Sequence, residues 1–331
     1  MHKQTVAFSK DSSNLFFHIL TKCNLSCTHC YINKEQHGTR TLDIKTILAW
    51  LNLFSDKASS TNLIYLGGEP TLHPDLSLAV KAAKKIGFKS ITIDTNGYLF
   101  HDILDKISSN DIDFLSFSLD GATQKTNDAL RGEGSFDKVM EGLQNARKRN
   151  FSCSMIYTVS DRNIHELELM PELVRHLGIK RFFIQVIGIR GASSKADNPL
   201  QVSRKAWLDT IPEVAEKIAG QGIIVTYPKV FLSPDEIFEC AGNVAKNYFI
   251  FPNGRIYLCP ICEDFPLHSY EIRENRVIST SKINEKDIFS LTIPEGCVMN
   301  KIIQPGNLSY EKNGAPEYRI ACCMLKEEIS K

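Results

Sequence analysis

The sequence predicts an α/β protein built on a parallel sheet of six strands. Between residues 15 and 187, segments with strand and helix patterns alternate, as in parallel sheets that are covered by helices and joined by right-handed crossovers. Distinctive polar or glycine-containing motifs end or follow several strands, at the edge where parallel α/β folds place their active sites. Three of the ten cysteines lie together near the start of the chain, and six lie in the last 92 residues.

The predicted elements follow one another without long gaps. Strands are predicted at 15–20, 62–66, 90–94, 114–119, 152–159 and 181–187. The intervening helices are predicted at 42–54, 75–86, 101–108, 136–149 and 164–177. In the first helix, apolar residues recur near a 3.6-residue period, which is typical of an amphipathic helix. Periodicity alone leaves open whether the six strands form an open doubly wound sheet or a partial barrel.

Composition limits the classes of partner. A chain of 331 residues can bury a substantial core, and its 39 basic and 38 acidic side chains give a net charge of +1. Such a balance provides no long-range attraction to nucleic acid or to an anionic membrane. No apolar run approaches the roughly 20 residues that span a bilayer, and no signal-peptide pattern is visible. We therefore expect a cytoplasmic protein whose cysteines serve metal or redox chemistry.

Cys23, Cys27 and Cys30 form a C-x3-C-x2-C triplet directly after the first strand. Three thiolates on one loop can hold three irons of a [4Fe-4S] cube and leave the fourth iron open to a substrate or cofactor. A zinc site is an alternative, but His29 would then have to turn back onto the same metal. A disulfide framework would leave one thiol unpaired. Cys153, alone in the fifth strand, is predicted to be a small buried hydrophobe.

The triplet, followed by the aromatic Tyr31, resembles the cluster-binding loop of the radical S-adenosylmethionine (radical SAM) enzymes. The resemblance implies that the open iron chelates the methionine amine and carboxylate of S-adenosylmethionine (SAM). An electron from the cluster then cleaves SAM to a 5′-deoxyadenosyl radical, and Tyr31 lies against the adenine. It also implies a (β/α)6 partial barrel and an electron donor such as flavodoxin or ferredoxin.

Two motifs after the second and third strands fit this resemblance. Gly67, Gly68, Glu69 and Pro70 match the family's GGEP motif, where paired glycines permit a close approach to a ligand but also supply an ordinary tight turn. The resemblance implies that Glu69 contacts the methionine amine. Asn96, in the Asn-Gly turn that ends the third strand, is implied to line the SAM pocket.

The end of the fourth strand carries a polar row. Alternation places Ser116, Ser118 and Asp120 on one face of the strand, and a polar inward face indicates a polar ligand. By resemblance to the family's S-x-D-G segment, Ser118 and Asp120 meet the ribose or carboxylate of SAM. Arg131 resembles an R-G segment of many relatives, or it is a solvated helix end. Gln185 on the sixth strand is a candidate substrate contact.

The second half of the chain divides differently. We predict a core domain at 12–190, a connection at 191–239 with a helix at 204–219 and a strand at 222–227, and a cysteine-rich extension at 240–331. Segments 248–251 and 255–258 flank an Asn-Gly turn and predict a β-hairpin that presents Cys259 at its end.

Cys240 and Cys259 resemble the opening of the SPASM and twitch extensions of radical SAM enzymes, which hold an auxiliary [4Fe-4S] cluster. Cys262 can reach the same metal as Cys259 through the x2 spacing. Cys322 and Cys323 are adjacent, so only one is expected to bind, and Cys322 is preferred. The roles of Cys297 and Cys323 stay open. The chain lacks the dense cysteine run of full SPASM domains, so one auxiliary cluster is expected, with a zinc site as the alternative.

These features predict a radical SAM enzyme that binds SAM and abstracts hydrogen from a peptide or protein side chain. A small-molecule dehydrogenase, or an enzyme of cofactor or antibiotic biosynthesis, is the second reading. A third is an iron-sulfur scaffold or redox sensor, although a scaffold has no use for GGEP and S-x-D-G segments. Only about a dozen residues precede the first strand, so no separate peptide-recognition domain is expected before it.

Overall fold

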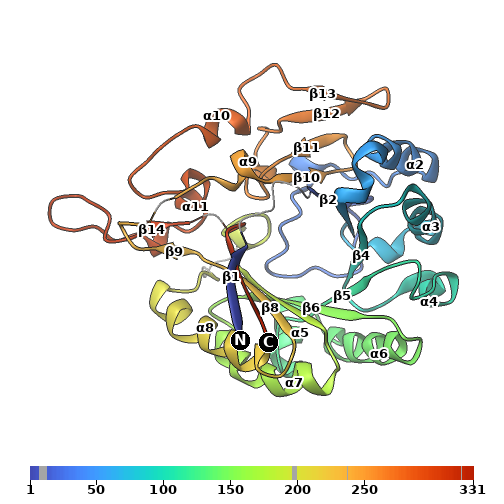
Figure 1. Ribbon diagram of the computed structural model, residues 1–331, viewed down its shortest axis with the longest axis horizontal. Helices are drawn as coiled ribbons and strands as arrows, with labels where there is room; N and C mark the ends of the chain where they lie inside the picture. Colours follow the sequence, from blue (N-terminus) through green and yellow to red (C-terminus); the bar gives the residue numbers. More distant parts are fainter. Residues whose placement is uncertain (7–12, 196–199, 237, 322) are drawn as a thin grey trace.

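The computed structural model describes residues 1–6, 13–195, 200–236, 238–321 and 323–331. Within these ranges the chain forms a large sheet whose strands follow the order β1-β15-β8-β7-β6-β5-β4-β3-β2-β10-β11-β12-β13, and a small separate pair of β9 and β14. Helices α2, α3, α4, α6, α7 and α8 lie along the outer side of the sheet, at the right and bottom of Figure 1.

The centre of the sheet is a continuous run of parallel neighbours. In sheet order these strands are β10 (Lys246–Ile250), β2 (Ser13–His18), β3 (Thr61–Leu66), β4 (Ser90–Thr95), β5 (Phe114–Ser118), β6 (Cys153–Val159), β7 (Arg181–Val186) and β8 (Ile224–Pro228). The predicted α/β class with a mostly parallel sheet is confirmed, and the six predicted strands are β2 to β7. The parallel part of the sheet contains more strands than the six predicted, because β8 and β10 extend it at either end.

Antiparallel strands complete both edges of the sheet. On one side β15 (Lys326–Ser330) pairs with β8, and β1 (His2–Val6) pairs with β15, so the two termini lie side by side (Figure 1). On the other side the predicted hairpin is present as β10 and β11 (Arg255–Tyr257), followed by β12 (Tyr270–Arg273) and β13 (Arg276–Ser279). The separate pair is β9 (Phe231–Leu232) with β14 (Arg319–Ile320). Since β10 also pairs with β2, the sheet runs on into the cysteine-rich extension, whose boundaries stay a prediction.

The helices in chain order are α1 (Lys34–His37), α2 (Ile44–Asn52), α3 (Leu76–Ile86), α4 (Ile103–Lys106), α5 (Gln124–Arg131), α6 (Ser135–Lys148), α7 (Met170–His176), α8 (Arg204–Ala219), α9 (Ala241–Val244), α10 (Glu285–Phe289) and α11 (Val298–Ile303). Helix α3 shows why such segments are helical. It buries Leu76, Ala79, Val80 and Ala83 on one face and ends at Gly87, whose left-handed φ of 92° suits a glycine cap.

Several helical segments differ from the prediction, and the short helices α1, α9, α10 and α11 were not predicted at all. Helix α5 was missed because its sequence, QKTNDALR, contains few apolar residues. The predicted helix at 101–108 shrinks to α4, because His101 and Asp102 adopt positive φ angles. The predicted helix at 164–177 divides into a 3-10 turn at Ile164–Leu169 and α7, where Pro171 lies in the first turn and favours a helix start.

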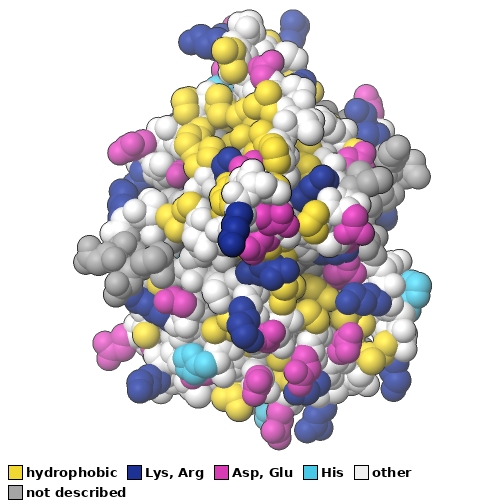
Figure 2. Space-filling model, turned by 90° about the vertical axis from the view of Figure 1, so that its left-hand side faces the viewer, with side chains coloured by type: hydrophobic (Ala, Val, Ile, Leu, Met, Phe, Trp, Pro, Cys, Tyr) yellow, Lys and Arg dark blue, Asp and Glu magenta, His cyan; other side chains and the backbone are white. Residues whose placement is uncertain are grey.

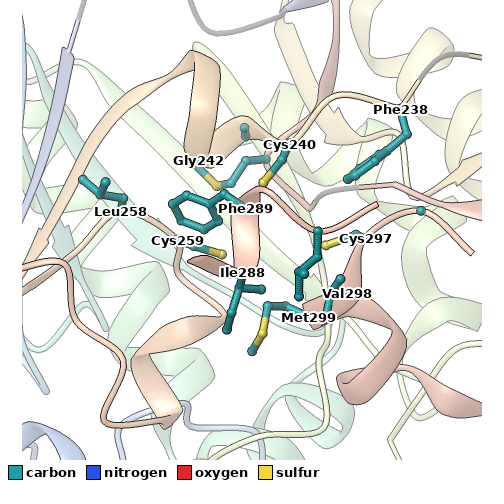
Figure 3. A pocket seen from close by; sticks show the side chains of 14 residues that line it. Phe238, Cys240, Gly242, Leu258, Cys259, Ile288, Phe289, Cys297, Val298 and Met299 are labelled. Atoms are coloured by element: carbon teal, nitrogen blue, oxygen red, sulfur yellow. The ribbon is translucent and has the colours of Figure 1, made fainter. Parts of the chain in front are cut away.

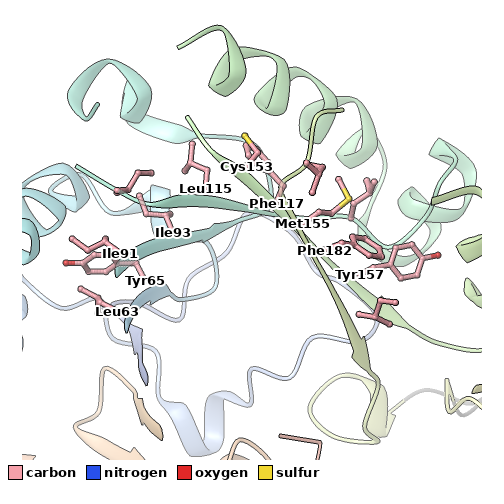
Figure 4. Packing of buried hydrophobic residues seen from close by; sticks show 14 of the residues in the cluster. Leu63, Tyr65, Ile91, Ile93, Leu115, Phe117, Cys153, Met155, Tyr157 and Phe182 are labelled. Carbon is pink, nitrogen blue, oxygen red and sulfur yellow. The ribbon is translucent and has the colours of Figure 1, made fainter. Parts of the chain in front are cut away.

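The two faces of the parallel sheet differ in polarity. Residues such as Leu63, Ile93, Phe117, Tyr157 and Phe182 are fully buried and pack on the helix side (Figure 4). The alternate residues of the same strands form the inner face, and several are polar: Thr92, Asp94, Ser116, Ser118, Thr158 and Gln185. Parallel strands that are covered on both faces are usually apolar throughout, so this polar face indicates a ligand-binding interior.

The molecular surface is mixed in character. Figure 2 shows hydrophobic side chains gathered in the upper half of one face and charged side chains spread over the rest. Of the large hydrophobic side chains in the described ranges that are at least 40% exposed, six belong to the cysteine-rich extension: Val277, Ile278, Ile283, Leu291, Ile302 and Tyr310. Among the described residues, no helix combines the length and apolarity that crossing a membrane requires.

Candidate functional site

The cysteine triplet lies on the loop that follows β2, at the carboxyl edge of the sheet. Backbone bonds from three neighbouring connections fix this loop. Glu69 N–H donates to the Lys22 carbonyl at 3.0 Å, Thr28 N–H donates to the Leu130 carbonyl at 2.9 Å, and Ala192 N–H donates to the Cys30 carbonyl at 2.8 Å. The segments after β3, β5 and β7 therefore hold the loop from different sides.

Gly67 and Gly68 permit the closest of these approaches. A Cβ atom on Gly68 would lie 2.3 Å from the Lys22 carbonyl oxygen, and one on Gly67 would lie 2.8 Å from the Leu20 carbonyl oxygen. Neither distance is compatible with a side chain. The glycines of the predicted GGEP segment are thus required to pack against the cysteine loop, and Pro70 begins the 3-10 turn Pro70–Leu72 behind them.

Glu69 is fully buried and joins the ends of β3 and β4. Its carboxylate accepts hydrogen bonds from the backbone and hydroxyl of Thr71, from the hydroxyl of Thr95 at 2.9 Å and from the backbone N–H of Asn96 at 2.7 Å. Burial raises the pKa of Glu69, and these bonds oppose the rise. One carboxylate oxygen takes three of the four bonds, so the other retains acceptor capacity.

Asn96 contacts the cysteine loop directly. Its side-chain amide donates to Asn24 Oδ1 at 2.8 Å and lies 3.8 Å from the Cys23 sulfur. The predicted pocket residue is therefore adjacent to the first cysteine of the triplet.

Asp120 forms the charged centre beneath the loop. It is 0% exposed, and its Oδ2 lies 2.6 Å from Arg131 Nε and 3.0 Å from His29 Nε2, while Thr158 N–H donates to Oδ1 at 2.6 Å. Burial alone would raise the pKa of Asp120, but Arg131 and His29 outweigh it and hold the pKa at about 2. Arg131 is therefore a buried partner of Asp120 and not a solvated helix end. Ser118 lies half-buried on the inner face of β5.

The cysteine side chains have the chemistry that an iron-sulfur cluster requires. Cys23, Cys27 and Cys30 are thiols without disulfides, and thiolates are the usual ligands of such clusters. Burial raises the pKa of Cys23, and it raises that of Cys27 to about 11, but the Arg131 charge opposes the rise at Cys27. The buried guanidinium therefore favours the thiolate form that a metal needs, and the residues present fit the cluster.

Tyr31 is partly buried and contacts the ring of His18. Its hydroxyl bonds to His18 Nε2 at 2.7 Å, and His18 Nδ1 donates to the Ile250 carbonyl at 3.1 Å. Burial lowers the pKa of His18 to about 3, so His18 is neutral, its Nε2 accepts and the Tyr31 hydroxyl donates. The guanidinium of Arg190 lies 5.0 Å from the Tyr31 ring centre. The predicted contact between Tyr31 and the adenine of SAM stays a prediction.

The C-terminal cysteines gather in a second place. Cys240, Cys259 and Cys297 line one pocket, together with apolar side chains such as Phe289 and Met299 (Figure 3). Cys262 is fully buried. Its pKa is raised, mainly by a hydrogen bond with Cys259 and secondly by burial. The structure thus brings together the predicted Cys240, Cys259 and Cys262, and it adds Cys297. The predicted Cys322 lies outside the described residues.

Among the described residues, no three His, Cys, Asp or Glu side chains converge closely enough to hold a single metal ion. A [4Fe-4S] cube differs from a single ion because each thiolate binds a different iron. A wider spacing of thiols is therefore compatible with a cluster.

Sequence analysis did not single out Asp94, which the structure adds to the polar inner face. It lies on the inner face of β4 beside Ser116 of β5, which hydrogen-bonds to it, and Lys326 of β15 attracts it. Burial raises the pKa of Asp94 to about 7, although Ser116 opposes the rise. The alternation of β4 was a usable signal, since it places a carboxylate on the polar face. Gln185 lies on the same face, on β7.

Asp94 is expected to reduce stability as the pH rises. A carboxyl group whose pKa is higher in the folded state holds its proton more tightly there, so stability falls from about pH 4 to about pH 7. Relative to the parent chain, Asp94→Asn should therefore become increasingly stable as the pH rises from about 4 to about 7, measured by urea unfolding. The exposed Asp56 provides a control, and Asp56→Asn should follow the parent. A constant difference between Asp94→Asn and the parent would contradict this assignment.

Comparisons with known proteins agree with this geometry. Residues 18–174 match the model of the radical SAM superfamily. The chain is 29% identical over 245 residues to the Fe-coproporphyrin III synthase of Methanosarcina barkeri, covering 71% of this chain and 58% of that protein. It is 24% identical over 269 residues to a probable GTP 3′,8-cyclase of Saccharolobus solfataricus, covering 78% and 85% respectively. The chain thus spans less than two thirds of the first relative and most of the second.

Solved structures show the same fold at low identity. Streptococcus suis SuiB superposes with a TM-score of 0.69 and 15% identity, covering 89% of this chain and 74% of that chain. The protein named anSMEcpe, with bound AdoMet, superposes with a TM-score of 0.61 and 14% identity, covering 88% and 83%.

Proposed function

The chain carries a radical SAM superfamily domain at residues 18–174, and on that premise we propose that it cleaves SAM reductively and abstracts hydrogen from a bound substrate. The observation that carries the proposal is that the cysteine loop meets both neighbouring motifs at one edge of the sheet: Asn96 lies 3.8 Å from the Cys23 sulfur, and the Cys27 sulfur contacts the backbone carbonyl of Arg131, whose side chain pairs with Asp120. A [4Fe-4S] cluster held by Cys23, Cys27 and Cys30 would supply the electron that cleaves SAM to a 5′-deoxyadenosyl radical.

In this proposal the protein's own residues bind SAM, orient it and shield it from water. We assign the SAM pocket to Tyr31, Gly67 to Pro70, Asn96, Ser118, Asp120 and Arg131. In this assignment Glu69 uses its less occupied oxygen to accept from the SAM amine. Asp120 and Arg131 neutralise each other, so they act by positioning the loop and the pocket wall. The inner face of the sheet, with Asp94 and Gln185, is the substrate side. We also infer that the curved sheet, with its helices outside (Figure 1), is a partial barrel.

The substrate that we propose is a peptide or protein side chain, with the electron supplied by a cytoplasmic flavodoxin or ferredoxin. One solved structure of SuiB, with a TM-score of 0.65, is described as bound to its precursor peptide SuiA. Small-molecule cofactor chemistry is the second candidate, and the names of the two sequence relatives favour it. The test is product formation: reconstituted protein given SAM and dithionite should release 5′-deoxyadenosine. If an added peptide encoded in the same gene neighbourhood increases the release of 5′-deoxyadenosine, the peptide substrate is supported. If a tetrapyrrole or a nucleotide increases it instead, the peptide substrate is contradicted.

We further propose one auxiliary [4Fe-4S] cluster at Cys240, Cys259, Cys262 and Cys297, with Cys297 in place of the predicted Cys322. The shared pocket supports this set. In a chain that lacks Cys23, Cys27 and Cys30, iron and sulfide analysis should give about four of each per chain. Adding Cys297→Ala should lower both values, whereas adding Cys153→Ala, on β6, should not. Zinc without sulfide would favour the structural zinc site, and loss of iron with Cys322→Ala but not with Cys297→Ala would restore the sequence-based ligand set.

A further inference from the structure

A buried set of contacts links the two cysteine sites. On one side, Tyr31 directly follows Cys30, and its hydroxyl is held by His18. On the other side, Glu263 directly follows Cys262 in the turn Cys262–Asp264. Arg190, from the connection after β7, lies between them.

Arg190 contacts both sides at once. Its guanidinium lies 5.0 Å from the centre of the Tyr31 ring. Its Nη1 donates to the Pro260 carbonyl and lies 3.2 Å from Glu263 Oε2. Pro260 and Glu263 are neighbours of Cys259 and Cys262, so one guanidinium joins the backbone of the C-terminal site to the ring beside Cys30. An arginine suits this task because its planar group stacks and donates in several directions.

The backbone after Arg190 makes a second connection to the same loop. Ala192 N–H donates to the Cys30 carbonyl at 2.8 Å. Gly191 has a φ of 56°, and a Cβ atom there would lie 2.4 Å from that carbonyl oxygen. A shift of the 190–192 segment would therefore move Cys30 as well as Tyr31.

Glu263 holds its end of the link rigidly. Its side chain is 2% exposed, and its carbonyl accepts from His37 Nε2 at 3.0 Å. His37 in turn stacks on Phe251, which stacks on His18 at 4.0 Å between ring centres. The contacts thus form a closed path through His18, Tyr31, Arg190, Glu263, His37 and Phe251, and they leave little freedom for one site to move alone.

We propose that Arg190 is a positioning residue through which occupation of the C-terminal cysteine site strengthens SAM binding at the N-terminal loop. The inference rests on the proposed function, since it needs a metal group at both sites. A group bound by Cys259 and Cys262 would fix Pro260 and Glu263, these residues fix Arg190, and Arg190 fixes Tyr31 and Cys30. By linkage, SAM binding would equally strengthen retention of the C-terminal group.

The test is a double-mutant cycle on SAM affinity, measured by calorimetry on anaerobically reconstituted protein. One change is Cys259→Ser with Cys262→Ser, which empties the C-terminal site. The other is Arg190→Gln with Glu263→Gln, which removes both charges together and leaves neither buried alone. Each change should weaken SAM binding about tenfold, within the usual range of coupling between sites. The combined protein should be weaker by about tenfold as well, because both changes break one link.

Additive behaviour, with a combined loss of about a hundredfold, would overturn the proposal, and so would parent-like affinity in Arg190→Gln/Glu263→Gln. Iron analysis on the same samples must show about four irons per chain in the proteins that lack Cys259 and Cys262 and about eight in the others. If the charge-neutral protein does not fold, Arg190→Lys replaces it in the same cycle. Lysine keeps a charge opposite Glu263 but lacks the planar surface. A non-additive loss of SAM affinity again supports the proposal, and an additive loss overturns it.

Arg204 provides the matched control. It lies 4.2 Å from the Tyr318 ring centre in another buried stack, and it has no contact with Tyr31, Pro260 or Glu263 among its described interactions. Arg204→Gln should leave SAM affinity within about twofold of the parent, and a loss as large as that of the Arg190 variant would overturn a specific role for Arg190. A parent protein with both clusters that binds no SAM would contradict the proposed function itself. A parent that binds SAM but behaves additively in the cycle would contradict only the coupling.

Discussion

Replacing Cys23, Cys27 and Cys30 together by Ala is expected to abolish formation of 5′-deoxyadenosine from SAM, with a loss of at least about a thousandfold relative to the reconstituted parent. These are the three thiols of the loop after β2, and under the proposed function the cleavage of SAM depends on the electron that a cluster held by them would supply. A thousandfold corresponds to about 4 kcal/mol of transition-state stabilisation. The measurement is product quantification by chromatography after anaerobic incubation with SAM and dithionite.

The control for this variant is Cys153→Ala. Cys153 is 1% exposed on β6 and packs on the helix side, away from the inner face. Its replacement removes a buried thiol without touching the loop, so product formation should match the parent. If the triple variant instead forms product at the parent rate, the N-terminal cysteines do not hold the SAM-cleaving cluster and the proposed function is wrong.

Asp120→Ala is expected to destabilise the metal-free folded chain by about 3–5 kcal/mol, because it leaves the Arg131 guanidinium buried without a partner. Asp120 is fully buried and lies 2.6 Å from Arg131 Nε. The same change frees His29, which lies between Cys27 and Cys30, so SAM binding should weaken at least about tenfold. Urea unfolding and calorimetry provide the two measurements.

A second double-mutant cycle separates the contribution of the Asp120–Arg131 ion pair from the contributions of its two side chains. Asp120→Ala with Arg131→Met removes both charges, and this double variant should be more stable than Asp120→Ala alone. Glu141→Ala is the matched control, since Glu141 pairs with Lys138 on the surface, where both side chains are about half exposed, and stability should stay at the parent value. Equal destabilisation by Asp120→Ala and Glu141→Ala would show that the buried pair has no special role.

Local patterns predicted much of the fold. Strand alternation placed β2 to β7 within a few residues of their observed bounds, and the predicted helix at 204–219 coincides with α8. These segments succeed because each buries an apolar face whose period is fixed by the backbone. The prediction missed helix α5 because this helix buries little apolar surface. It contributes only Leu130 to the core as an apolar side chain, and its buried Asn127 and Arg131 are held by polar contacts that a hydrophobic pattern does not contain.

The sequence by itself determined the chemistry of the chain: thiols at a spacing typical of a cluster loop, paired glycines after a strand, and polar side chains at strand ends. Such features are local, because they depend on residues near one another in the chain. Only the tertiary structure decided which of these side chains are partners. It paired Asp120 with Arg131 and His29, brought Cys297 beside Cys259, and set Arg190 between Tyr31 and Glu263. These contacts join residues up to about 160 positions apart, so they depend on strand order and on burial, where an unpaired charge is costly, and no local pattern records them.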